Sequence, residues 1–205
     1  MSKLLVPRKA VYRLSLYYRG LQRLKANRVS TVSSAALAKA AGVKPTQLRK
    51  DLTYFGQFGT RGLGYNVEAL SAKVTEVLGH ARSQPVVLVG VGHLGSALLR
   101  YNGFAKEGFE IVAAFDLEPR NPFPEMKVDC LGMEALEDYV RANRIKMAIL
   151  AVPAAAAQEV ANRLVEAGIQ GMLNFSPILL QLPDGVVVNN VDLAIELEYL
   201  SYLVR

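Results

Sequence analysis

Acidic residues are almost absent from the first third of this chain, which is 205 residues long. Residues 1–65 hold 13 of the 24 Lys and Arg and only one of the 18 Asp and Glu, Asp51, so their net charge is about +12. The rest of the chain is net negative, because the whole chain is only +6. Lys and Arg attract nucleic acid by neutralising phosphates and releasing counterions. This segment is therefore predicted to bind a polyanion, with a solvated basic surface as the alternative.

Cysteine, histidine and long apolar runs are also scarce. Cys130 is the only cysteine, which excludes an internal disulfide and favours a reducing cytoplasm. The two histidines, His80 and His93, form no cluster with it, so we expect no metal site. No run of about 18 apolar residues predicts a membrane span, and residues 1–9 lack the apolar region of a secretory signal. With 51% hydrophobic and 20% charged residues, the composition indicates a cytoplasmic globular chain of one large or two small domains.

The basic segment has the pattern of a helix-turn-helix. Apolar spacing predicts a helix over 7–26, and two shorter helices over 35–41, capped by Ser33 or Ser34, and 45–54. Ala38 is small enough for close helix packing, Gly42 suits a turn with positive φ, and Val43, Leu48 and Leu52 supply the packing contacts. The second helix of the pair then exposes side chains suited to base edges and phosphates: Lys44, Thr46, Gln47, Arg49 and Lys50.

A glycine-rich stretch follows this motif. Residues 55–65 alternate four glycines with aromatic residues and one arginine, a pattern that predicts a short hairpin, and residues 67–79 have helical spacing. A hairpin after a helix-turn-helix forms the wing of a winged helix. Thr60 and Arg61 would lie at its tip, where an arginine can enter the minor groove of an A·T tract.

The second half of the chain alternates predicted strands and helices. This alternation is typical of a parallel sheet with helices on both faces. A last amphipathic helix, 192–204, is apolar on more than one face, so we expect it to be buried in a partner subunit. The predicted strands are 85–89, 109–115, 147–152, 168–173 and 186–188, and the predicted helices are 94–103, 133–143 and 154–167.

The first of these strands leads into a dinucleotide-binding fingerprint, G-x-G-x-x-G. The glycines allow a tight turn, a close approach of the backbone to a pyrophosphate, and close packing of helix on strand. Asp116, at the end of the second strand, would accept from the ribose hydroxyls and repel a 2′-phosphate, which favours NADH or NAD⁺ over the phosphorylated cofactor. The residues of the fingerprint are Gly90, Val91, Gly92, His93, Leu94 and Gly95.

A general acid or base beside the nicotinamide is not recognisable, although a dehydrogenase needs one. We therefore predict that the chain is not an enzyme and that the nucleotide is a signal. One alternative is an NAD-dependent dehydrogenase with a basic N-terminal extension. Another is a repressor whose second domain binds a different adenine nucleotide, such as coenzyme A.

These motifs resemble those of the bacterial redox-sensing repressor family Rex over essentially the whole chain. The most specific motifs are 47–56 (QLRKDLTYFG) and 59–65 (GTRGLGY). Three further motifs support the resemblance: the Gly90 loop, 173–177 (LNFSP) and 190–193 (NVDL). The resemblance implies a homodimer with a swapped C-terminal helix that binds a pseudo-palindromic operator when NADH is low. NADH, competing with NAD⁺, would then release the DNA.

The expected fold is thus α/β: an N-terminal winged helix-turn-helix domain (1–79), a Rossmann-like parallel-sheet domain (80–189) and a domain-swapped helix (190–205). Position and resemblance to the family place Tyr101 near the nicotinamide. Phe175 is also expected to bind the cofactor. Arg19, Tyr101 and Asp192 are the candidate switch. We expect Asp192 to pair with Arg19 and accept from Tyr101 in the absence of NADH, and NADH to displace Tyr101.

Overall fold

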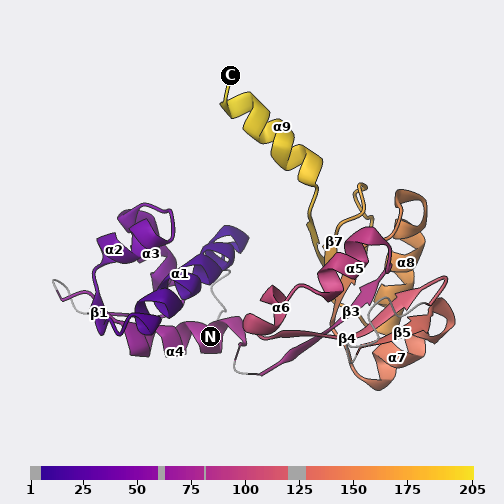
Figure 1. Cartoon of the computed structure of the whole chain (residues 1–205). Helices are drawn as coiled ribbons and strands as arrows, with labels where there is room; N and C mark the ends of the chain where they lie inside the picture. Colours follow the sequence, from indigo (N-terminus) through magenta and orange to yellow (C-terminus); the bar gives the residue numbers. More distant parts are fainter. Residues whose placement is uncertain (1–5, 60–62, 81, 120–127) are drawn as a thin grey trace. The chain divides into compact units, whose positions relative to one another are not determined.

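The computed structural model describes residues 6–59, 63–80, 82–119 and 128–205, in two compact units (Figure 1). The first unit comprises residues 1–82 and the second residues 83–205. The first is mainly helical, and the second contains a parallel sheet with helices, so the α/β class is confirmed.

The first unit packs its helices around an aliphatic core in which the ring of Tyr17 is fully buried. Ser33 caps the second helix, accepting from the backbone N–H of Ala36 at 3.1 Å, and Asn66 caps the last one in the same way. Gly42 has φ +67, the left-handed turn expected between the second and third helices. The elements are α1 (Arg8–Ala26), β1 (Thr31–Val32), α2 (Ser34–Ala40), α3 (Pro45–Thr53), β2 (Tyr65–Asn66) and α4 (Val67–Leu78).

The predicted hairpin within 55–65 includes residues 60–62, which lie outside the described residues, so it stays a prediction. β2 pairs antiparallel with β1, which precedes the helix-turn-helix in the sequence, and Val32 lies opposite Tyr65. This pairing was not predicted, because strand pairing depends on which backbone edge lies alongside, and two-residue strands carry almost no periodic signal.

The second unit is built on six parallel strands in the order β5-β4-β3-β6-β7-β8. Counted within this unit, that order is 3-2-1-4-5-6, the arrangement of a dinucleotide-binding Rossmann sheet, with its crevice where the order reverses, between β3 and β6. The strands are β3 (Gln84–Val89), β4 (Phe109–Asp116), β5 (Asp129–Gly132), β6 (Met147–Leu150), β7 (Gly171–Asn174) and β8 (Val187–Asn190).

Helices cover the two faces of this sheet unequally. α7 (Leu136–Ala142), preceded by the 3-10 turn Met133–Ala135, and α8 (Ala154–Ala167) pack on one face in the larger core. α5 (His93–Leu99) and α6 (Gly103–Lys106) pack on the other. That second face keeps an apolar hollow of about 290 Å³, lined by side chains that include Phe109, Ile149 and Leu173.

Several predicted bounds are corrected. The helix predicted over 94–103 is two helices, α5 and α6, and the strand predicted from 168 begins at 171, because Gly168 ends α8 with φ +110. β5 was not predicted. It is a four-residue edge strand that pairs with β4 alone, and its sequence DCLG has no alternation.

The last helix, α9 (Leu193–Leu203), buries none of its residues in this chain. Its apolar side chains are between 53% and 82% exposed. Exposed apolar faces of this size are typical of surfaces that bind a partner. Those side chains are Leu193, Ile195, Leu197, Tyr199, Leu200, Tyr202, Leu203 and Val204.

Candidate functional site

The fingerprint loop runs from the end of β3 into α5, as predicted. Gly90 has φ +93, and a Cβ there would lie 2.4 Å from the carbonyl oxygen of Ala151. A Cβ on Gly95 would lie 1.8 Å from the carbonyl oxygen of Gly90, so only glycine lets α5 pack this close to β3. Around Gly92 there is open space, and no side chain caps the start of α5. The loop therefore has the shape that a pyrophosphate needs.

Asp116 ends β4 beside this loop, and its carboxylate is held by the backbone. Oδ2 accepts from the N–H of Val91 at 2.6 Å, and Oδ1 accepts from the N–H of Glu118 at 3.1 Å. A carboxylate has about four acceptor positions, so these two bonds orient Asp116 and leave capacity for ribose hydroxyls. The dinucleotide predicted from the sequence fits this arrangement.

A cavity of about 620 Å³ opens next to the loop. It brings together Gly90, Gly92, Leu94, Asp116 and Phe175 from the predicted set. Val91, His93, Gly95 and Tyr101 do not line it. The remaining lining was not predicted and comes from the ends of β3 and β4, the 3-10 turn, the end of β6 and α8: Val89, Leu117, Met133, Ala151, Val152, Pro153, Ala156, Glu159, Val160 and Arg163.

Arg163, the cation among the described lining residues, is held by neighbouring groups. Arg163 binds both carboxylate oxygens of Glu137, at 2.5 Å and 3.0 Å, and donates to the carbonyl of Met133 at 2.6 Å. The hydrogen bond from Arg163 lowers the pKa of Glu137 below its ordinary value, although burial opposes the shift. Among the described lining residues, Asp116 and Glu159 outnumber Arg163, so the net charge of these residues is negative.

The predicted switch residues lie in ordinary local environments. Asp192 is the N-cap of α9, where Oδ1 accepts from the N–H groups of Ala194 and Ile195. Tyr101 is 59% exposed and meets the ring of Phe104 edge-on at 5.1 Å. Arg19 is exposed on α1, in the other unit. The pairing of Asp192 with Arg19 thus stays a prediction.

In the first unit, α3 exposes most of the residues predicted to bind DNA. Lys44, Thr46, Arg49 and Lys50 are exposed, and Nη1 of Arg49 donates to Oγ of Ser34 at 3.0 Å. Gln47 differs from the prediction, because it is half-buried and its amide is engaged in the protein. Thr60 and Arg61 lie outside the described residues.

Gln47 belongs to a polar cluster around Asp51, which is completely buried. Arg13 on α1 donates to both carboxylate oxygens, at 2.5 Å and 2.7 Å, and Tyr17 donates to Oδ2 at 2.6 Å. Nε2 of Gln47 donates to Oδ1 at 2.8 Å. Burial alone would raise the pKa of Asp51, but these hydrogen bonds outweigh it and lower the pKa. One sequence signal pointed here, since Asp51 is the single acid among thirteen bases.

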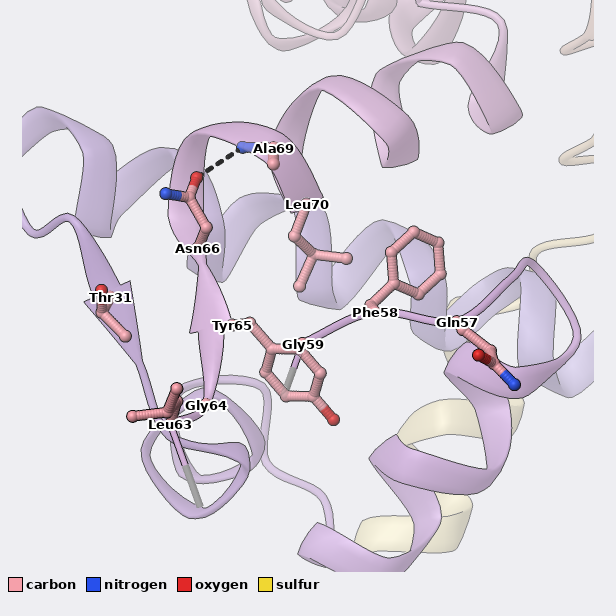
Figure 2. A pocket seen from close by; sticks show the side chains of 10 residues that line it. All are labelled: Thr31, Gln57, Phe58, Gly59, Leu63, Gly64, Tyr65, Asn66, Ala69 and Leu70. Carbon is pink, nitrogen blue, oxygen red and sulfur yellow. Dashed lines mark hydrogen bonds between the residues drawn. The ribbon is translucent and has the colours of Figure 1, made fainter. Parts of the chain in front are cut away.

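The connection from α3 to β2 is tightly constrained where it is described. A Cβ on Gly64, which has φ +79, would lie 2.5 Å from the carbonyl oxygen of Val32. A pocket of about 350 Å³ lies beside this connection. Figure 2 shows its lining, with the Tyr65 ring next to Gly59 and the capping bond that the N–H of Ala69 donates to Asn66. The glycines therefore let the two chain segments at the base of the predicted wing approach closely.

Among the described residues, no group of three or more His, Cys, Asp and Glu is arranged to hold a metal ion. None of the described helices is long and apolar enough to cross a membrane.

Comparison with known proteins matches each unit and then the whole chain. Residues 5–53 match the family model described as a putative DNA-binding protein N-terminus, and residues 81–178 match that of a CoA binding domain. A curated relative, the redox-sensing transcriptional repressor Rex of Carboxydothermus hydrogenoformans, is 46% identical over 201 residues, which covers 98% of this chain and 97% of that protein.

Two solved structures have the same fold over 98% of this chain. One is RSP in complex with β-NAD⁺ and operator DNA, 39% identical, with a TM-score of 0.90 and 93% of that chain covered. The other is RSP with β-NADH, 37% identical, with a TM-score of 0.86 and 94% covered. RSP is described as a Rex-family repressor.

These similarities cover 98% of the chain. The relatives are repressors, which confirms the prediction of a regulator over that of a dehydrogenase. This chain belongs to the family of redox-sensing transcriptional repressors named Rex.

Proposed function

We propose that this protein is a transcriptional repressor that binds operator DNA and releases it when NADH replaces NAD⁺ in its second unit. The observation that carries the proposal is the presence of both sites in one chain. A basic helix-turn-helix occupies the first unit, and a Rossmann loop with an oriented acid, Asp116, occupies the second. Relatives solved with NAD⁺ and operator DNA, and with NADH, support it.

The cofactor we propose is NADH or NAD⁺ and not its 2′-phosphorylated form. The Gly90–Gly95 loop would hold the pyrophosphate, and Asp116 would accept from the adenosine ribose hydroxyls. A 2′-phosphate would meet Asp116 and Glu159, while Arg163 is committed to Glu137. Phe175 and Tyr101 are proposed for the nicotinamide end.

The DNA interface we propose has α3 in the major groove. The exposed Lys44, Thr46, Arg49 and Lys50 would contact phosphates and base edges, together with Gln47. Thr60 and Arg61 are proposed for an adjacent minor groove. The domains we assign are 1–79 for DNA, 80–189 for the cofactor and 190–205 for the partner subunit.

We propose a homodimer, and the exposure of α9 supports it. Burying its apolar side chains in a second copy of the chain would remove them from water, and the apolar hollow on the sheet offers such a surface. A two-fold dimer would present two copies of α3 to a pseudo-palindromic operator. We place the protein in the cytoplasm, because a single cysteine is suited to a reducing compartment and NADH is present there.

The switch we propose joins Asp192 from the partner subunit, Arg19 and Tyr101. A ligand shifts a conformational equilibrium only by binding the two states differently. Displacement of Tyr101 by the neutral, reduced nicotinamide would break the contact of Asp192 with Arg19, and the two α3 helices would leave operator spacing.

One titration tests the function. An operator selected from randomised duplexes is bound by the full-length protein, and NADH, NAD⁺, NADPH and coenzyme A are added separately. We expect NADH to release the DNA and NAD⁺ to oppose that release. Release by coenzyme A alone would favour the second candidate, which the match to a CoA binding domain supports, and release by no nucleotide would refute the sensing function.

A further inference from the structure

The amide of Gln47 has a single orientation in this structure, and a buried carboxylate imposes it. Nε2 of Gln47 donates to Oδ1 of Asp51, one turn further along α3, at 2.8 Å. An ionised carboxylate only accepts hydrogen bonds, so the amide oxygen of Gln47 cannot take this place. The ionised form is secured because Arg13 and Tyr17 donate to the same carboxylate.

Asp51 is itself fixed by contacts that do not involve the surface of α3. The guanidinium of Arg13 engages both oxygens from α1, and the hydroxyl of Tyr17, also on α1, donates to Oδ2. Two parallel N–H donors give such a pair a defined geometry as well as energy. The orientation of Gln47 is thus set by the core of the domain and not by its own rotamer preference.

The bond to Asp51 decides which groups Gln47 has left for a ligand. Its amide begins with two N–H donors and one acceptor oxygen, and Asp51 takes one donor. One N–H donor and the acceptor oxygen of the same amide remain. In the major groove adenine presents the complementary pair, the N7 acceptor and the N6 donor, whereas guanine presents two acceptors.

We propose that Gln47 reads adenine in the major groove and that Asp51 is the positioning residue that restricts it to adenine. Without Asp51, both N–H groups of Gln47 are available to the N7 and O6 of guanine, and the discrimination is lost. Gln47 lies near the N-terminal end of α3, the part of a recognition helix that contacts base edges. The inference rests on the proposed insertion of α3 into DNA.

The test compares base preference and not affinity alone. Full-length parent and variants are each used to select from a library of randomised duplexes. Binding is then measured on the best duplex and on duplexes in which each adenine of a half-site is changed to guanine. The variants are Gln47→Met, Asp51→Asn and the double variant. Gln22→Met is the matched control, because Gln22 makes an equivalent amide bond to Ser71, on α4, at 3.1 Å.

We expect the parent to prefer adenine over guanine at one position of each half-site by between about fivefold and about a hundredfold, the discrimination of one bidentate contact. Gln47→Met and Asp51→Asn should each abolish that preference, and the double variant should lose no more than either alone. Gln22→Met should keep the profile of the parent.

Two results would overturn the proposal. The first is an adenine preference that survives Gln47→Met. This variant leaves the Asp51 ion pair in place, so it tests the role of Gln47 even if Asp51→Asn does not fold. The second is an Asp51→Asn protein that binds every duplex more weakly but keeps the preference, since Asp51 would then only hold α3 to α1. Lys50→Ala, tested in parallel, separates these results from a failure of the interface itself: unchanged affinity would mean that α3 does not bind DNA.

Discussion

Asn174 and Asn190 join the ends of two neighbouring strands, with Nδ2 of Asn174 donating to Oδ1 of Asn190 at 2.9 Å. Asn174 is fully buried and ends β7, directly before Phe175 of the cavity, whereas Asn190 ends β8, two residues before the N-cap of α9. The backbone N–H of Val191 also donates to the carbonyl of Asn174, at 2.8 Å. The start of α9 is thus tied to the loop that forms one wall of the cavity.

Asn190→Ala should weaken the influence of NADH on DNA binding. The substitution removes the side-chain bond between the strand ends, and Asn190 is exposed, so we expect little loss of stability. Operator affinity measured with and without saturating NADH should show a smaller ratio than in the parent. Asn143→Ala is the control and should keep the parent's ratio, because Asn143 is also exposed and its amide donates to the carbonyl of Tyr139 at 2.9 Å, away from these strand ends. Equal ratios in all three proteins would show that this bond takes no part in coupling.

Asp116→Ala should weaken NADH binding by about 1–3 kcal/mol, the contribution of a hydrogen bond to a charged group. The parent should bind NADH more tightly than NADPH. The difference between the two affinities should be smaller in the variant, because the repulsion between Asp116 and the 2′-phosphate is removed. Fluorescence titration with both nucleotides measures the two affinities. Equal affinity of the parent for NADH and NADPH would contradict the role of Asp116.

Lys50→Ala and Arg49→Ala should each weaken operator binding without changing NADH affinity. If Lys50 contacts a phosphate, its loss should reduce the slope of log affinity against log salt by about one unit and affect all sequences alike. Lys73→Ala is the control, since Lys73 lies on α4 and pairs with Glu76 at 2.7 Å. Gel-shift titrations at several salt concentrations give both quantities, and unchanged slopes for both α3 variants would argue against the interface.

Asp192→Asn separates two roles of one carboxylate. Asparagine is as good an N-cap as aspartate, so α9 should keep its start, whereas the charge needed to pair with Arg19 is lost. We expect weaker operator binding in the absence of NADH and a reduced response to it, with a parent-like thermal unfolding curve. Tyr101→Phe should likewise reduce the response. Parent-like binding and release in both variants would leave Asp192 as a cap only.

Acidification should destabilise the α7–α8 contact through Glu137. Because the Arg163 hydrogen bond lowers the pKa of Glu137 in the folded state, its stabilising effect is complete above the unfolded pKa, about 4.3. That effect is lost as pH falls through the folded value. Hydrogen exchange of α7 and α8 amides between about pH 3 and pH 7 should show this loss in the parent and not in Glu137→Gln. Glu76→Gln, at an exposed pair, should follow the parent.

The local motifs could be predicted from the sequence because each depends on residues that are close together in the chain. Gly42 between two short helices and the run Gly90–Gly95 after an apolar strand restrict the backbone within a few residues, and the structure has both as expected. β5 and the pairing of β1 with β2 could not be predicted from the sequence. Their strands are two to four residues long, and the segments that complete them are distant in the chain.

The residues of this chain determined by themselves a basic helix-turn-helix followed by a dinucleotide fold, because charge, apolar period and glycine spacing are local properties. Only the tertiary structure decided how charged and polar groups are paired. Asp51 meets Arg13 from 38 residues away, and Arg163 meets Glu137 across two helices. Such pairs form because a buried charge must be compensated, and the partner is whichever side chain the packing of the helices brings within reach.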